Sequence, residues 1–276
     1  KVNTNAEKYV AWQWKANGGT TTSVSASGSG ITDILASTHQ ANTTAGFSIV
    51  SWTSVDSEAY VSHGLGAIPH VVLMKDRESG SANWIMYHVS VGSAHALLLN
   101  TNSAQDGSSF FRDSDLATTG IPTSSIFKLG TQDHTGGHTN DMIAYCFAPI
   151  QGYSKFGSYI GNGNADGAFI YLGFKPAFVI IKSSTKASQG WHMLTGKIAR
   201  VNNGSFTGTN SNPVSDALDA DDTTAERGDF TTDFLSNGFK IRHVSGGTGT
   251  SGETYTYMAF AEQPFVTSTG IPATAR

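Results

Sequence analysis

Two long segments of this chain follow one plan, and this internal repeat limits the possible folds more than any other feature. Residues 46–75 and 152–182 each open with Gly, an aromatic residue and Ser, and each later passes through a Gly-x-x-Pro turn into an apolar run that ends in Lys. Matched residues stand 107 positions apart at three places: Pro69 and Pro176, Lys75 and Lys182, and Trp84 and Trp191. One offset held at three anchors indicates homologous units, so we expect the chain to be at least partly a duplication.

The repeated segments favour β-structure. Residues 152–182 form three short apolar runs separated by turn residues, and the chain holds 31 Gly with many Ser, Thr and Asn between its apolar runs. Turns need the positive φ angles that Gly and Asn tolerate. A 3.6-residue apolar period is weak and confined to residues 215–226. The sequence therefore predicts an all-β protein with two tandem antiparallel β-sandwich-like repeat units.

These units define a domain plan. Residues 46–149 are expected to form the first unit, residues 150–265 the second, and residues 266–276 a polar, extended tail. Residues 17–45 are rich in Gly, Ser and Thr and are interpreted as a linker or a long surface excursion.

Residues 1–16 contain the string YVAWQW, which resembles two later apolar strings, MIAYCF and YMAFAE, that close the two units. We interpret it as the closing strand of a preceding unit, and the chain also lacks an initiator Met, so the intact protein is expected to be longer at its N-terminus. The alternative is that this strand completes the sheet of the first unit.

Composition excludes several classes of partner. Charged residues make up 14% of the chain and the net charge is −4, so we expect no binding to nucleic acid or to anionic membranes. No apolar run approaches the roughly 20 residues that span a bilayer, so membrane insertion is not expected. Cys146 is the single cysteine and is read as a buried, inert thiol.

An acidic segment is the first candidate metal site. The proposed ligands are Asp219, Asp221 and Asp222, which stand close to Asp216, Glu226 and Asp229. Calcium prefers several carboxylate and carbonyl oxygens, so Ca²⁺ is the ion that this segment would take, and no other cofactor is expected. The spacing does not fit an EF-hand loop, and a solvated acidic loop is the alternative.

His134 and His138 are the second candidate. Their i, i+4 spacing would place both rings on one helix face for zinc, but they flank Thr-Gly-Gly, which predicts a turn instead. Motifs for nucleophilic catalysis and phosphate loops lack their strand and helix context. We expect no enzyme activity, and a polysaccharide-degrading enzyme that draws its acids from the acidic segment is kept as an alternative.

Sugar binding has better physical support, because flat rings cover the apolar faces of sugars while amides and carboxylates pair with hydroxyls. Amide-rich loops are better candidates than the repeated Trp84 and Trp191, whose recurrence indicates core packing. The predicted ligand-binding residues are Asn162, Asn164, Asp166, Asn102 and Asn210.

The strings YVAWQWKANGG, GYSKFGSYIGNGNADGAFIYLGFKPAFVIIK, DFLSNGFKIR and YTYMAFAEQPF resemble a repeat domain of unknown function. It occurs in tail-fibre and other tail-structural virion proteins of marine bacteriophages and cyanophages. The resemblance implies a virion location, contacts with other virion proteins and a homo-oligomer, a trimer if the protein is a fibre; it brings no catalytic residues. The expected function is structural and adhesive: the C-terminal part of a tail-fibre-like protein that presents loops to a host surface polysaccharide. A capsid or tail subunit with a purely structural role is the alternative.

Overall fold

The computed structural model describes residues 5, 9–28, 33–108, 110–111, 122–132, 134–135, 137–196, 201–202, 205–206, 212–226, 228 and 230–262. Within these ranges the protein is built almost wholly from antiparallel strands, and the one helix, α1 (Gly246–Gly249), has 4 residues. The prediction of an all-β fold is confirmed. The predicted tail at 266–276 lies outside the described residues.

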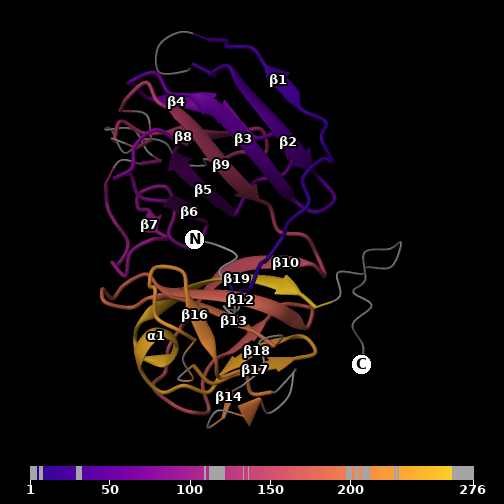
Figure 1. The fold of residues 1–276 in the computed structure, drawn as a ribbon, viewed down its shortest axis with the longest axis vertical. Helices are drawn as coiled ribbons and strands as arrows, with labels where there is room; N and C mark the ends of the chain where they lie inside the picture. The colour runs from indigo at the N-terminus through magenta and orange to yellow at the C-terminus, as the bar shows by residue number, and fades with distance from the viewer. Residues whose placement is uncertain are drawn as a thin grey trace.

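The first half of the chain forms a seven-stranded sheet covered on one face by a two-stranded sheet; we call the two sheets together the first sandwich (Figure 1). The seven-stranded sheet has the order β1-β2-β3-β9-β5-β6-β7 and the small one pairs β4 with β8. The strands are β1 (Thr22–Val24), β2 (Ser37–Asn42), β3 (Phe47–Thr53), β4 (Ala59–Ser62), β5 (Val71–Asp76), β6 (Ile85–His88), β7 (Leu97–Leu98), β8 (Ile126–Leu129) and β9 (Asp141–Phe147).

Alternation along each strand fills the core of the first sandwich. Val50 and Trp52 on β3 point toward the small sheet, where Val61 and Phe127 meet them. The Trp52 and Phe127 rings pack edge to face with centroids 5.6 Å apart. Successive side chains of a strand point to opposite sides, so the residues between these face the other way.

The second half forms the second sandwich, from a five-stranded sheet with the order β10-β19-β12-β13-β16 and a three-stranded sheet with the order β11-β18-β17. Its strands are β10 (Ser154–Ile160), β11 (Phe169–Tyr171), β12 (Pro176–Ser183), β13 (Trp191–Thr195), β16 (Ala217–Asp219), β17 (Thr232–Leu235), β18 (Gly238–Ile241) and β19 (Thr254–Ala261). A separate hairpin pairs β14 (Val201–Asn202) with β15 (Ser205–Phe206).

The two large sheets share one arrangement of strands. The order β3-β9-β5-β6-β7 of the first sandwich corresponds position by position to β10-β19-β12-β13-β16 of the second. Lys75 on β5 donates to the backbone oxygens of Ser79 and Ala82, and Lys182 on β12 donates to that of Gln189. Both lysines thus hold the loop that follows their strand.

The two sandwiches pack back to back through the remaining faces of their large sheets (Figure 1). Phe147 on β9 lies with its ring centroid 6.2 Å from that of Phe156 on β10 and 6.0 Å from that of Phe260 on β19. Trp191 is buried in this layer, and its indole N–H donates to the backbone oxygen of Leu98 at 2.9 Å. Trp84, its matched residue, is half-buried and stacks on Tyr145. We call this apolar cluster the joint.

The N-terminal segment differs from expectation. Residues 9–16 form no strand, although YVAWQW has a strong strand-like composition. The Trp12 ring stacks on Phe178 with centroids 4.6 Å apart, and Trp14 packs on Phe147 and Phe260. The apolar pattern of this segment reflects the partial burial of its tryptophans against the joint, not pairing of its backbone.

The interval interpreted as a linker at residues 17–45 contains two strands that its Ser- and Thr-rich composition did not indicate. β2 pairs with β3 along its whole length, and β1 pairs with β2 at the sheet edge. Thr38 and Ser51 join their hydroxyls across β2 and β3 at 2.8 Å. Short hydroxyl side chains suit an outer strand that packs few apolar groups, which is why the stretch resembled a linker.

Phe178→Ala tests the joint. The ring is 5% exposed and packs on Trp12 and Phe260, so its loss should lower the free energy of unfolding by about 3–5 kcal/mol. Chemical denaturation measures the change. The matched control is Phe169→Ala, because this ring is 46% exposed and should cost much less. Equal losses for the two variants would show that the joint contributes little.

The buried His88 makes the stability of the joint depend on pH. It is buried, its ring Nε2 lies 3.2 Å from the backbone oxygen of Tyr257 across the joint, and burial together with the charge of His70 lowers its pKa to about 4. In the unfolded chain His88 takes up a proton near pH 6.5, whereas in the native protein it stays neutral until about pH 4. The free energy of unfolding should therefore fall as the pH drops from 6.5 toward 4, by up to about 1.4 kcal/mol per pH unit.

Urea unfolding at pH 7, 5.5 and 4.5 measures this loss, with His88→Gln as the comparison, because Gln can still donate to Tyr257 but does not titrate. The wild type should lose more stability than the variant on acidification. Parallel losses would assign the acid sensitivity to other groups.

Candidate functional site

The outer face of the three-stranded sheet exposes two aromatic rings. Phe169 and Tyr171, at alternate positions of β11, are 46% and 60% exposed, while Ile170 between them is buried in the core of the second sandwich. Side chains two apart on a strand share one face, so both rings lie on the solvent side of this sheet. The sequence signal for these rings is the alternation in the string FIY, which contains neither a tryptophan nor an amide side chain.

The register of the sheet leaves the Tyr171 ring open on the side of β18. Tyr171 stands opposite Gly238 on β18, so no side chain lies beside its ring on that strand. A Cβ atom at Gly238 would collide with the backbone oxygen of Ile170, which explains why this position holds glycine. On the other side, the Lys155 ammonium lies 5.3 Å from the centroid of the Tyr171 ring and donates to the Tyr171 backbone oxygen.

A row of charges borders the rings. Lys240 on β18 stands opposite Phe169 and binds the carboxylate of Asp166 at 2.5 Å. Arg242 contacts Asp166 at 3.4 Å and donates through Nε to Asp233 at 2.6 Å. The hydrogen bond and charge of Lys240, with the charge of Arg242, hold the pKa of Asp166 below its usual value. We call Phe169, Tyr171, Asp166, Lys240 and Arg242 the aromatic face.

The predicted residues Asn162, Asn164 and Asp166 belong to one turn beside this face. The Asn162 side chain accepts from the Asn164 amide and donates to the Asp166 backbone oxygen, and the Asn164 side chain accepts from the Asp166 amide. The two asparagines therefore shape the loop that holds Asp166. Asn102 lies in the first sandwich, where its backbone oxygen accepts from Gln189, and Asn210 lies outside the described residues.

The acidic segment gives its carboxylates separate partners. Asp219 lies 2.6 Å from the His192 ring, Asp221 accepts from the Trp191 amide, and Asp222 accepts from the Thr224 amide. Within the described part of the chain these three do not form a close group of three ligands, and Asp229 lies outside it. The calcium site at this segment stays a prediction without support from geometry.

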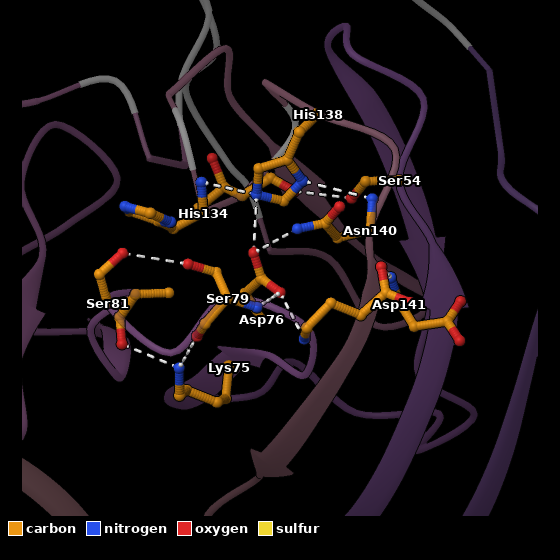
Figure 2. A network of polar contacts seen from close by, with 12 residues as sticks. Ser54, Lys75, Asp76, Ser79, Ser81, His134, His138, Asn140 and Asp141 are labelled. Atoms are coloured by element: carbon orange, nitrogen blue, oxygen red, sulfur yellow. Dashed lines mark hydrogen bonds and ion pairs between the residues drawn. The ribbon is translucent and has the colours of Figure 1, made fainter.

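A different cluster does bring ligand atoms together. Asp76 at the end of β5 meets His134 and His138 from the loop between β8 and β9 (Figure 2), with ligand atoms all within 4.8 Å of one another. His138 Nε2 lies 3.0 Å from Asp76 Oδ2. The loop turns, as Thr-Gly-Gly predicted, and this turn still places both rings at one point. Asp76 could not be anticipated, because it is distant in sequence.

The surroundings hold this cluster in place. Asp76 Oδ1 accepts from the amides of Glu78 and Ser79 at 2.8 and 2.9 Å, and Oδ2 accepts from the Asn140 side chain at 2.9 Å. Burial acts to raise the pKa of the Asp76 carboxyl, but these hydrogen bonds and the charge of His138 lower it below its usual value overall. The loop itself is tied to the end of β3, since Ser54 donates to the backbone oxygen of Thr135.

Fold and sites together define a β-sheet protein of back-to-back sandwiches with an open aromatic face. The chain belongs to the family described as a domain of unknown function, DUF7483, whose model matches residues 1–264. No curated protein and no solved structure matches the chain. In the described residues no helix has the length and apolar character needed to cross a membrane.

Asp76→Asn tests the structural part of the cluster. With a chelator present, the variant should lose about 1–3 kcal/mol of unfolding free energy. The Asp76 carboxylate accepts hydrogen bonds through both oxygens, whereas an amide replaces one of these oxygens with an N–H₂ group that faces a donor. Denaturant titration measures the loss. Asp141→Asn is the control, since this carboxylate accepts an exposed hydrogen bond from Thr53. A loss no larger than that of the control would contradict a structural role for Asp76.

Proposed function

We propose that this chain is a non-enzymatic adhesive module of a virion appendage, the C-terminal part of a phage tail-fibre-like protein, that binds a host-surface polysaccharide through the aromatic face. The observation that carries the proposal is the pair of exposed rings, Phe169 and Tyr171, set beside Asp166, Lys240 and Arg242. The virion location rests on the family resemblance of the sequence.

The chemistry of the aromatic face suits a sugar ligand. The apolar face of a pyranose stacks on an aromatic ring, and its hydroxyl groups need both donors and acceptors at the rim. Asp166, with a side chain that is 78% exposed, supplies acceptors, while Lys240 and Arg242 supply donors. A bound polysaccharide would lie along β11, touching Phe169 and Tyr171 in turn.

The rest of the fold is consistent with a repeat module that presents a binding surface on a rigid scaffold. The matching strand order of the two large sheets supports the view that the chain is a duplication, with units at 46–149 and 150–265. β11 is an edge strand backed by the core of the second sandwich, so its rings are presented on a rigid support. Assembly as a homotrimer within the appendage is part of the same proposal.

The binding test uses host-surface polysaccharide and the full chain in calorimetry or a glycan array. The double variant Phe169→Ala and Tyr171→Ala should lose affinity about tenfold or more, because aromatic anchors carry much of the binding free energy at such surfaces. Ile68→Ala is the matched control, since Ile68 is an apolar side chain, 53% exposed, in the first sandwich.

The outcomes separate the alternatives. If the double variant binds the polysaccharide as tightly as the wild type, the binding site lies outside the aromatic face. No binding by a chain that forms a stable trimer in light scattering would instead favour the structural-subunit alternative. Release of reducing ends from the polysaccharide would favour the enzyme.

A further inference from the structure

The cluster of Asp76, His134 and His138 has the composition of a metal centre. Two imidazole nitrogens and one carboxylate oxygen are ligands that zinc and other divalent transition metals accept, commonly as three protein ligands around one ion. Ligand atoms about 2.0–2.2 Å from one ion lie about 3–4 Å from each other. His138 Nε2 and Asp76 Oδ2 are 3.0 Å apart, and the whole set spans 4.8 Å, so small side-chain rotations would close it around an ion.

Hydrogen bonding within the protein leaves this cluster incompletely satisfied. His138 Nε2 lies 2.9 Å from the amide nitrogen of His134 and also 3.0 Å from the Asp76 carboxylate. One ring nitrogen either accepts from the amide or donates to the carboxylate, so one of these contacts is always unfavourable. His134 Nδ1 is also buried without a hydrogen-bond partner.

We propose that Asp76, His134 and His138 bind one divalent transition-metal ion, with zinc as the best match to this ligand set. A cation accepts one lone pair from each imidazole and one from the carboxylate, so the repulsion between Nε2 of His138 and the Asp76 oxygen is replaced by two bonds to the ion, while the contact between the His134 amide and Nε2 is given up. The hydrogen bonds from Glu78, Ser79 and Asn140 to Asp76 supply the outer support that metal-binding carboxylates usually have (Figure 2).

The ion would join distant parts of the first sandwich. Asp76 ends β5, and both histidines belong to the loop that runs from β8 to β9, so the ion would clamp this loop over the open end of the core. A metal ion that binds the folded chain and not the unfolded chain increases the stability of the fold. The proposed role is structural and is independent of sugar binding at the aromatic face.

The second sandwich provides an internal comparison. Ser183 ends β12 where Asp76 ends β5, so the carboxylate ligand has no counterpart there. The corresponding end is closed by tyrosines: Tyr255 donates to the backbone oxygen of Gly246 and Tyr159 to that of Thr248. The chain should therefore bind one ion, not two.

Calorimetric titration of zinc into the chelator-stripped, tag-free full chain, with elemental analysis after dialysis, tests the proposal. We expect about one zinc per chain and a higher melting temperature with zinc. His134→Gln should weaken zinc binding by on the order of 10- to 100-fold or more, and it should fold, because its ring Nδ1 has no hydrogen bond to lose. His95→Gln, a half-buried histidine before β7, is the matched control and should bind like the wild type.

Asp76→Asn gives a second check with a different ligand. Cobalt(II) replaces zinc as a visible probe, and the wild type should show the absorption of a bound low-coordinate ion that both ligand variants lack. The proposal is overturned if the wild type takes up no zinc or cobalt, or if His134→Gln binds zinc as tightly as His95→Gln.

Discussion

The central strands of the two large sheets are largely buried on both faces, because the sheets pack back to back in the joint while their other faces cover the two sandwich cores. A strand in this position cannot use the simple alternation of apolar and polar residues that a half-exposed sheet shows. Polar groups inside it need partners within the protein: Ser48 donates to the backbone oxygen of His63, and Trp191 donates to that of Leu98 across the joint. The interior therefore combines dense apolar packing with a few well-placed hydrogen bonds.

The open ends of the two cores are closed by different chemistry. In the second sandwich, tyrosine hydroxyls hold α1 over the core, and the glycines of α1 allow close approach, since a Cβ at Gly247 would collide with the His192 ring. In the first sandwich, a carboxylate and two imidazoles occupy the same position. The same strand order in the two large sheets is thus combined with ionisable side chains at one end and neutral tyrosine donors at the other.

Strands marked by the repeat or by local turn residues could be predicted from the sequence. Contacts between segments that are distant in sequence could not, because they depend on tertiary packing. The 107-residue offset and the turn glycines indicated the strands, as at β5 and β12. Composition alone misled at Trp12 and Trp14, whose alternating partial burial against the joint resembles a strand, and at β2, whose polar sequence STHQAN resembles a linker. Asp76 reaches the histidines only through the pairing of β5 with β9, and the exposure of Tyr171 depends on Gly238 standing opposite it.

Trp12 and Trp14 pack, partly buried, against the joint: Trp12 stacks on Phe178 of the second sandwich, and Trp14 contacts Phe260 of the second sandwich and Phe147 of the first. This placement has a mechanical consequence. Because Trp14 packs on rings of both sandwiches, a force applied at residues 9–16 should be shared by the two sandwiches and act on ring contacts, not on the hydrogen bonds of an edge strand.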